Sequence, residues 1–218
     1  MKKTSIIALS LFVLLSTITT QQNIKISKFD INKIDIENNI LTKKKDLKKS
    51  LSILYGKNIF FLESKEIGNI LMSNSFIESF EIKKKYPDTL KITIFEKKPI
   101  AILFNKKERF YLSDKIDLIE YNELKKFQDL PIVVGNKNKF KIFYDDLKTI
   151  QFPFNEIKKF TLYESNRWDL ETIDKKEIKL PSENYLNKLE NYLDLINRNN
   201  FKKYKVFDYR IENQFILK

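Results

Sequence analysis

The fold of the first half of the chain is decided by residues 86–99, which read YPDTLKITIFEKKP. Within them Leu90, Ile92 and Ile94 alternate with polar residues, which is the two-residue period of a strand with one buried and one solvated face. The YPDT that comes first is typical of a turn, because proline pre-sets one backbone angle and aspartate can hydrogen-bond its own backbone. Pro99 cannot donate to a central ladder, so the strand is expected to end before it.

Upstream of this strand the sequence predicts one strand, two helices and a second strand. The strands are expected at residues 24–31 and 76–84. The first helix ends at Gly56, and Ser64 is expected to cap the second. Each helix has an apolar stripe at helical spacing: Leu47, Leu51 and Leu54 in the first, and Ile67, Ile70 and Leu71 in the second. Residues 24–99 are therefore predicted to fold as β-α-α-β-β, with both helices on one face of a three-stranded sheet.

Residues 100–218 are predicted to form a second, mostly antiparallel β domain with helices, so the fold class is α+β throughout. Strands are expected at 100–104, 110–113, 157–163 and 167–173. One helix is predicted around residues 140–147. A longer helix is expected after Ser182, with the apolar stripe Tyr185, Leu186, Leu189, Tyr192, Leu193 and Ile196. The chain ends in a candidate hairpin of residues 204–211 and 214–218.

Residues 1–23 are predicted to be a cytoplasmic tip and a membrane anchor. Two lysines precede an uncharged run from Thr4 to Asn23, about 20 residues, which is just enough to cross a bilayer. Its apolar centre, Ile6 to Ile18, is short enough for a cleaved secretion signal, but no cleavage site of the A-x-A type follows. We therefore expect an uncleaved anchor through residues 4–20, with the lysines inside the cell and the bulk of the chain in the periplasm.

Composition excludes several kinds of chemistry. The 218 residues include no Cys and no His, which removes disulfides, thiolate nucleophiles, His general bases and Cys/His metal sites. The three glycines of the chain do not form the glycine-rich motif of a P-loop or of a dinucleotide-binding site. The net charge of +12 could attract nucleic acid or anionic lipid, but the lysines are scattered, which favours solvated surface. We expect no nucleic-acid partner, no cofactor and no small-molecule substrate.

The remaining candidates for catalysis are pairs of carboxylates. Asp145 with Asp146, and Asp114 with Asp117, could serve acid-base or metal chemistry, but neighbouring carboxylates on a helix or turn are more often solvated surface. No Ser lies in an S-x-x-K motif. The chain is therefore not expected to be an enzyme.

Three stretches of the first domain resemble a known family. Residues 56–60 read GKNIF, residues 76–77 read FI, and residues 86–101 read YPDTLKITIFEKKPIA. With the two helices in this order and spacing, the patterns G-x-N-(I/L)-F and P-x-T-L-x-I-x-(I/V)-x-E-(K/R)-x-P-x-A resemble the POTRA domain of FtsQ/DivIB cell-division proteins.

The second half resembles the same family. It contains LPIVVG at 130–135, NRWDL at 166–170, KLP at 179–181 and VFDYR at 206–210. FtsQ proteins carry L-P-x-x-x-G, R-x-W or R-W, L-P and a late hydrophobic-D-x-R strand in these places. Two features depart from the family: the glycine usual after the aspartate of the early hairpin is missing at 114–116, and the tail beyond the last strand is absent.

The resemblance implies a single-pass inner-membrane scaffold at the division septum, which binds FtsB and FtsL and helps recruit and regulate septal peptidoglycan synthesis. POTRA domains also occur in outer-membrane transport and assembly proteins, and an envelope protein of that kind is the alternative. The two functions differ in location, since a division protein gathers at a mid-cell ring.

The last hairpin is the candidate partner-binding surface, because an open edge strand can accept a strand from another protein. By resemblance Arg210 and Ile211 lie where the family's D-x-R strand contributes partner contacts, and Arg167 belongs to the match with the family's R-x-W or R-W. The strand to be extended contains Phe215, Ile216 and Leu217. Some alternatives remain open: Phe215 and Leu217 merely close the domain, Asp208 and Arg210 form a structural ion pair, and Trp168 and Tyr209 belong to the core.

Overall fold

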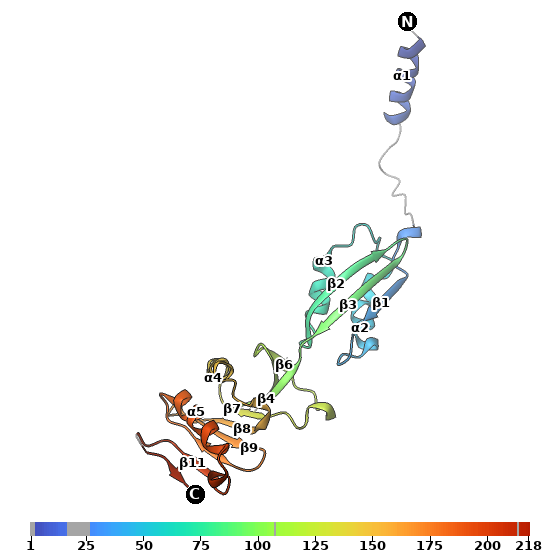
Figure 1. Ribbon diagram of the computed structural model, residues 1–218. Helices are drawn as coiled ribbons and strands as arrows, with labels where there is room; N and C mark the ends of the chain where they lie inside the picture. Colours follow the sequence, from blue (N-terminus) through green and yellow to red (C-terminus); the bar gives the residue numbers. More distant parts are fainter. Residues whose placement is uncertain (1–2, 17–26, 107, 213) are drawn as a thin grey trace.

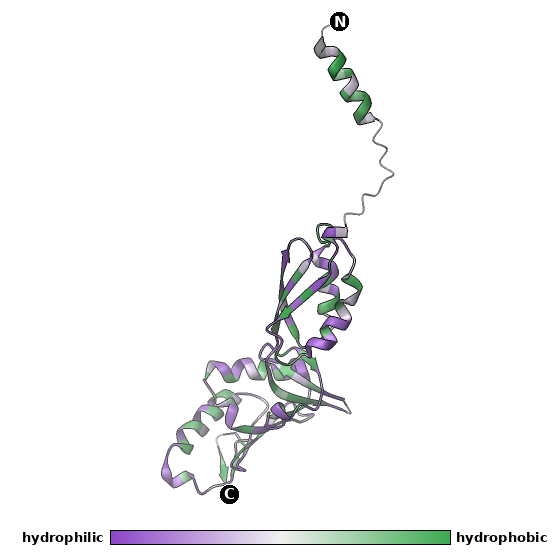
Figure 2. Ribbon diagram, turned by 90° about the vertical axis from the view of Figure 1, so that its right-hand side faces the viewer, coloured by the Kyte–Doolittle hydropathy of each residue, from purple (hydrophilic) through white to green (hydrophobic). Residues whose placement is uncertain are grey.

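The computed structural model describes residues 3–16, 27–106, 108–212 and 214–218. It consists of helix α1 (Lys3–Ser16) followed by two β-sheet units, one after the other along the chain (Figure 1). The described large apolar side chains of α1 are exposed, and Figure 2 shows hydrophobic residues along most of the helix. Within the described ranges no helix is both long enough and apolar enough to span a membrane. Part of the expected anchor, residues 17–20, lies outside the described residues.

The first unit has the predicted order β-α-α-β-β. Its elements are β1 (Lys33–Glu37), α2 (Lys44–Ser50), α3 (Ser64–Leu71), β2 (Ile77–Lys85) and β3 (Thr89–Glu96). The sheet order is β1-β3-β2, with β1 parallel and β2 antiparallel to the central β3. The helices cover one face of this sheet (Figure 1). β3 is therefore the central strand on which both neighbours depend.

The predicted burial register of β3 is confirmed. Leu90, Ile92 and Ile94 are fully buried and pack with the apolar stripes of α2 and α3. The first predicted helix is divided: α2 ends at Ser50, and residues 51–54 continue as a 3₁₀ helix. Gly56 then adopts a φ of +76°, a left-handed conformation that glycine accepts without the steric cost of a Cβ.

Three details of the predicted elements were wrong. The first strand is β1, not residues 24–31, whose described part contains a 3₁₀ helix at Ser27–Phe29. Ile31 and Lys57 are instead joined by a backbone hydrogen bond of 2.9 Å, which closes the start of the unit onto the loop after α2. Neither Ser64 nor Ser182 caps a helix: α3 begins at Ser64 itself, and α5 follows Asn184.

The second unit is built on one nine-stranded sheet. Its strands are β4 (Pro99–Asn105), β5 (Glu108–Ser113), β6 (Leu118–Glu120), β7 (Ile132–Val134), β8 (Ile157–Leu162), β9 (Trp168–Thr172), β10 (Glu177–Lys179), β11 (Val206–Asp208) and β12 (Ile216–Leu217). Their order is β12-β11-β10-β9-β8-β7-β4-β5-β6. Three neighbouring pairs, β4–β7, β7–β8 and β10–β11, are parallel, and the others are antiparallel. Pro99 is the first residue of β4, a position where its missing N–H is tolerated.

Two helices, α4 (Lys137–Thr149) and α5 (Tyr185–Ile196), cover one face of this sheet. Phe143 of α4 stacks on Trp168 of β9 with ring centroids 4.9 Å apart, so Trp168 is a core residue. Gly135 allows the turn before α4 to pass close to β8, since a Cβ there would lie 2.7 Å from the Cβ of Leu162. In the part of the chain that the structure describes, α4 and α5 leave the opposite face of β8–β11 uncovered.

A third apolar cluster joins the two units. Phe76 and Leu41 of the first unit pack with residues of the second that include Tyr111 and Phe127. The carboxylate of Glu96, at the end of β3, accepts hydrogen bonds from the backbone N–H groups of three successive residues, Ile40, Leu41 and Thr42, at 2.7–2.9 Å. Glu96 thereby holds Leu41 against the second unit.

Candidate partner-binding face

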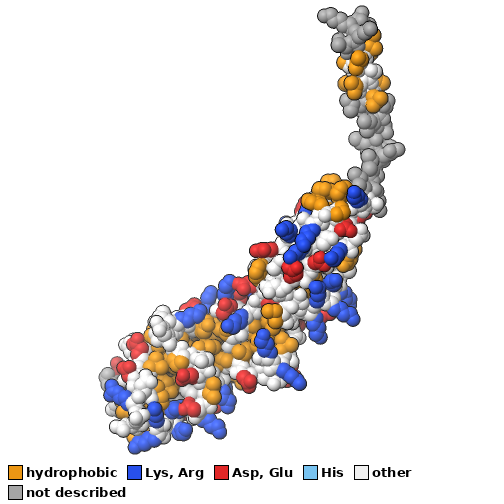
Figure 3. All heavy atoms as spheres, turned by 45° about the vertical axis from the view of Figure 1, so that its right-hand side comes forward, with side chains coloured by type: hydrophobic (Ala, Val, Ile, Leu, Met, Phe, Trp, Pro, Cys, Tyr) orange, Lys and Arg blue, Asp and Glu red, His pale blue; other side chains and the backbone are white. Residues whose placement is uncertain are grey.

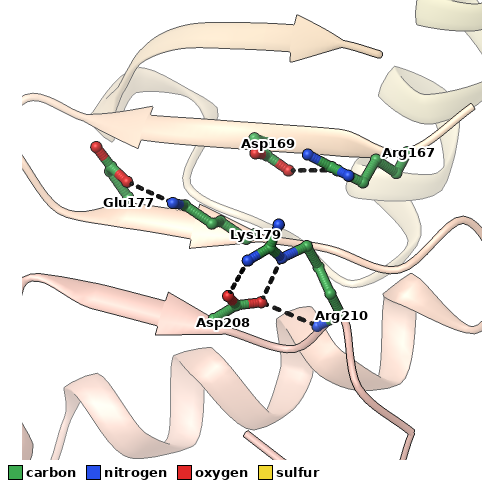
Figure 4. A network of polar contacts seen from close by, with 6 residues as sticks. All are labelled: Arg167, Asp169, Glu177, Lys179, Asp208 and Arg210. Atoms are coloured by element: carbon green, nitrogen blue, oxygen red, sulfur yellow. Dashed lines mark hydrogen bonds and ion pairs between the residues drawn. The ribbon is translucent and has the colours of Figure 1, made fainter. Parts of the chain in front are cut away.

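The uncovered face of the second sheet carries a strip of charged side chains across β9, β10 and β11 (Figure 4). Successive residues of a strand point to opposite faces, and the buried positions of these strands face the helices. The alternate positions therefore share the open face. The charged residues there include Arg167, Asp169, Glu171, Glu177, Lys179, Asp208 and Arg210, of which Figure 4 draws all but Glu171.

Arg210 and Asp208 form the best-bonded pair of the strip. Nε of Arg210 donates to Oδ1 of Asp208 at 2.8 Å, and Nη2 donates to Oδ2 at 2.5 Å. The backbone N–H of Arg210 donates to the same Oδ1 at 3.2 Å. These hydrogen bonds to Arg210 lower the pKa of Asp208 below its usual value despite partial burial. The Asp208 side chain is 12% exposed and that of Arg210 is 43% exposed, so the arginine is the accessible member.

Arg167 and Asp169 have the same spacing but a looser contact. Nε of Arg167 lies 3.5 Å from Oδ1 of Asp169, an ion pair without a hydrogen bond between these two atoms. Burial raises the pKa of Asp169, and Arg167, Lys179 and Arg210 offset part of that effect. The guanidinium of Arg167 instead stacks on the ring of Tyr163, 4.3 Å from its centroid. Asp169 is therefore a partly buried carboxylate that its arginine does not fully satisfy.

A shallow depression of about 280 Å³ lies in this face over β8–β10. It is lined by Lys159, Thr161, Tyr163, Asp169, Leu170, Glu171, Glu177 and Lys179. Both signs of charge line it, which suits side chains of a protein partner better than a single anionic or cationic ligand.

The strip ends at an open sheet edge formed by β12, whose one neighbour in the sheet is β11. Phe207 lies opposite Leu217, and Asp208 lies opposite Ile216. Lys218 exchanges two backbone hydrogen bonds with Val206, at 3.0 and 3.1 Å. Because hydrogen-bonded and non-hydrogen-bonded pairs alternate in an antiparallel ladder, the backbone N–H and C=O of Leu217 point to the open edge.

The predicted partner-binding residues divide between the two faces. Ile216 shares the open face with Asp208, since directly opposed residues of a pair point the same way, and Arg167 and Arg210 lie on that face too. Ile211 is exposed in the bend after β11. Phe215 and Leu217 lie on the helix side, where Phe215 stacks on Tyr209 at 5.8 Å and Leu217 packs against the core.

Two residues considered as alternatives lie in the interior. Tyr209 is buried and donates its hydroxyl to Oδ1 of Asn191 at 3.1 Å. Trp168 packs in the core, and its neighbour Arg167 stacks on Tyr163 instead. Residues missed by sequence reasoning are Asp169, Glu177 and Lys179. The alternation of E-I-K at 177–179 is a weak signal that could have placed the last two on one face.

One of the carboxylate pairs considered for catalysis, Asp145 with Asp146, has structural contacts. Asp146 accepts a hydrogen bond from the hydroxyl of Tyr185, and burial together with Asp146 raises the pKa of that tyrosine. Asp145 lies 3.5 Å from Nζ of Lys148 on the same helix. Within the described residues no group of three or more acidic side chains is arranged to hold a metal ion.

The chain matches two family models: the FtsQ-type POTRA domain over residues 29–97, and the C-terminal domain of cell division protein FtsQ/DivIB over residues 102–210. The second match alone spans half of the 218 residues. The chain belongs to the FtsQ/DivIB family of cell division proteins. The predicted POTRA domain and C-terminal β domain of this family member are thereby confirmed.

Individual relatives agree with this family. The chain is 28% identical over 195 residues to cell division protein FtsQ of Rickettsia bellii, a match that covers 87% of this chain and 72% of the relative. It is 34% identical over 112 residues to cell division protein DivIB of Clostridium botulinum, covering 50% and 43% of the two chains.

A solved structure is also similar to this FtsQ/DivIB member. It is the major extracytoplasmic domain of the trans isomer of DivIB from Geobacillus stearothermophilus, with 17% identity and a TM-score of 0.34. The similarity covers 47% of this chain and 92% of that domain.

Proposed function

We propose that this protein is a non-catalytic division scaffold whose C-terminal sheet binds FtsB, alone or as an FtsB/FtsL pair, and so helps recruit and regulate septal peptidoglycan synthesis. The observation that supports this most directly is the open edge at β12 beside the charged strip. An incoming extended segment would pair with the outward backbone groups of Leu217 and lengthen the sheet by one strand.

Side chains beside the edge would give this pairing its specificity. An incoming strand would place alternate side chains on the open face next to Ile216, and the charged strip with Arg210 continues that face on the far side of β12. Asp208 engages Nε and Nη2 of Arg210, which leaves Nη1 as the group that a partner's carboxylate can reach. We therefore expect the bound FtsB segment to carry an acidic residue on that face and apolar residues beside Ile216.

We further propose that residues 1–23 hold the protein in the inner membrane, with residues 24–99 and 100–218 as the two periplasmic domains. The exposed apolar surface of α1 supports this, because a helix that is hydrophobic all round needs an apolar environment. Extraction of membranes with alkaline carbonate tests it. Release of the full-length protein into the soluble fraction would contradict an integral anchor.

The binding site is tested with the full-length protein and its Ile216→Asp and Arg210→Ala variants, by capture of FtsB/FtsL in detergent. A charge at Ile216 would face the new strand, so we expect at least a tenfold loss of affinity, about 1.4 kcal/mol. Arg210→Ala should slow association and weaken binding too. Ile142→Asp is the control, because Ile142 is also an exposed isoleucine, 63% against 39% for Ile216, but lies on α4. Undiminished capture by both variants, with melting temperatures near wild type, would place the site elsewhere.

A further inference from the structure

Four aromatic residues lie together at one end of the first unit, the end where the chain enters it at residue 27. We call this group the aromatic pole: Phe29, Phe60, Phe61 and Tyr86. The ring centroids of Phe29 and Phe60 are 4.8 Å apart, and those of Phe60 and Tyr86 are 4.7 Å apart. Phe60, Tyr86 and Phe61 are 51%, 57% and 85% exposed. Figure 3 shows hydrophobic side chains gathered at this end of the unit.

Three segments far apart in the sequence build this pole. The start of the unit is joined to the loop after α2 by a bridge between Asp30 and Asn58 and by a hydrogen bond from Ile59 N–H to the C=O of Phe29, at 2.9 Å. Nζ of Lys84, at the end of β2, donates to the C=O of Leu62 at 2.9 Å. The loop is thus tied down on both sides, and its aromatic rings are held in place rather than loosely exposed.

The core of the first unit does not use Phe60 and Phe61, although it uses their neighbours in the same loop. Ile59 and Leu62 of the same loop are buried in the core, whereas Phe60 and Phe61 between them point outward. A group of exposed apolar side chains on a folded unit marks a surface that contacts a protein or a membrane. The question is what covers it.

The chain itself indicates the neighbour. The apolar helix α1 ends at Ser16 and the pole begins at Phe29, thirteen residues later. A segment of that length spans at most about 45 Å when fully extended, so the pole cannot be far from the layer that takes up α1. Lys28 and Lys85 adjoin Phe29 and Tyr86 in sequence, and lysines at such positions can reach lipid phosphates while aromatic rings settle among the headgroups.

We propose that the aromatic pole rests on the outer surface of the phospholipid bilayer, with Phe61 inserted at the headgroup level. This inference rests on the proposed membrane anchor, which brings the pole to the bilayer. The first unit then stands on the membrane by one end, because β1 and β3 run from the pole to the joint with the second unit (Figure 1). The contact sets the height and direction at which the partner-binding face is presented.

The test uses the full-length protein in phospholipid vesicles with Phe61→Trp as reporter. Phospholipids with brominated acyl chains quench indole emission on contact. We expect the added emission of Phe61→Trp to be blue-shifted and lost in brominated vesicles, more strongly with anionic than with zwitterionic lipid. Ile142→Trp, on α4 of the second unit, is the control and should keep its emission. The native Trp168 is buried and gives the same background in both.

A second arm separates failure of the pole from failure of the anchor. Residues 27–218 lack α1 but contain every member of the three apolar clusters, so this fragment keeps its cores. Its Phe61→Trp form should be quenched at high lipid concentration, and Phe60→Ser with Tyr86→Ser should abolish this. If carbonate releases the full-length protein, the anchor fails and this fragment alone decides.

Two results would overturn the proposal. One is Phe61→Trp emission that brominated lipid does not quench. This is measured in the full-length protein if it resists carbonate extraction, and in the fragment of residues 27–218 if it does not. The other is a blue shift without bromine quenching, which would mean that a protein surface or a second copy of the chain covers the pole.

Discussion

Arg167 and Arg210 each lie two residues from an aspartate, yet the two pairs differ in strength. Arg210 donates two side-chain hydrogen bonds to Asp208. Arg167 instead stacks on Tyr163, and its Nε lies 3.5 Å from Oδ1 of Asp169. The pKa values of the two carboxylates accordingly move in opposite directions, down for Asp208 and up for Asp169. The same two-residue spacing on one strand face therefore produces one carboxylate whose charged form is well stabilised and one whose charged form is stabilised less.

Replacing Arg210 with Gln should raise the pKa of Asp208. The charged form of Asp208 loses the hydrogen bonds from the guanidinium, which stabilise it most, while its partial burial remains. In the wild type the depressed pKa contributes stability above the unfolded value near 3.9, and this is lost as pH falls through the folded value. The difference in stability between wild type and variant should therefore shrink as pH falls from about 4 and vanish below the folded pKa of Asp208. Carbon NMR titration of the Asp208 carboxyl checks this. Lys179→Gln is the weaker control, and an unshifted pKa in Arg210→Gln would show that Arg210 is not the cause.

At the scale of elements, the turn between β5 and β6 forms without the family's glycine. Ile116 takes a φ of +62° and is buried, and Oγ of Ser113 accepts hydrogen bonds from the N–H groups of Lys115 and Asp117 at 3.2 and 3.0 Å. A β-branched residue in the left-handed region costs roughly 1–2 kcal/mol. Burial of the isoleucine side chain offsets that cost.

This balance predicts an unusual order of stability at residue 116. Ile116→Ala should lower the melting temperature, because it removes about 2–5 kcal/mol of buried contacts and keeps a Cβ at positive φ. Ile116→Gly loses the same contacts but relieves the backbone, so it should be at least as stable as the alanine variant. In a helix, by contrast, glycine is less stable than alanine by about 1 kcal/mol. Thermal melts of both variants decide, and a glycine variant clearly less stable than alanine would contradict the strain.

Elements with strong local periodicity were predictable from the sequence, and those that depend on distant partners were not. β3 was identified because alternation, turn chemistry and a closing proline coincide in 86–99. The first strand was misplaced because residues 24–31 alternate as well as 33–37 do. The choice was made by long-range bonds such as Gly56 N–H to Ile31 C=O. The parallel pairs of the second sheet leave no local signature, since each requires a crossover.

The candidate site follows the same division. Arg210 and Ile216 could be singled out from strand parity and from the family pattern near the end of the chain. Lys179 could not be placed beside Asp208 in advance, because the parallel pairing of β10 with β11 brings together residues separated by helix α5. The charged strip is thus a product of topology, and its residues become a site only when the sheet has assembled.

For the whole molecule, the relation between the two units depends on a small apolar joint. Glu96 ends the central strand of the first unit and binds three backbone N–H groups, so that Leu41 reaches the cluster around Tyr111 and Phe127. Ser75 Oγ also accepts from the N–H of Glu120 at 2.9 Å, across the joint. Nζ of Lys115 also pairs with the carboxylate of Glu78 across the joint, and along the chain β3 and β4 are linked by residues 97–98.

Replacing Glu96 with Ala should loosen this joint while both sheets stay folded. The N–H groups of Ile40, Leu41 and Thr42 lose a charged acceptor, a change worth about 1.5–3 kcal/mol per bond in buried settings and less at this partly exposed site. These amides should therefore exchange with solvent much faster, and the amides of β3 should stay protected. Glu37→Ala is the control, since Glu37 also lies near the end of a strand of this sheet but pairs with Lys91 and not with the N–H groups of residues 40–42. With Leu41 released, small-angle scattering should report a broader range of distances between the units. Amides 40–42 that stay protected in Glu96→Ala would mean that packing of Leu41 holds the loop without the carboxylate. The placement of the partner-binding face would then depend on the apolar cluster and on the remaining contacts across the joint, such as Glu120 N–H to Ser75 Oγ.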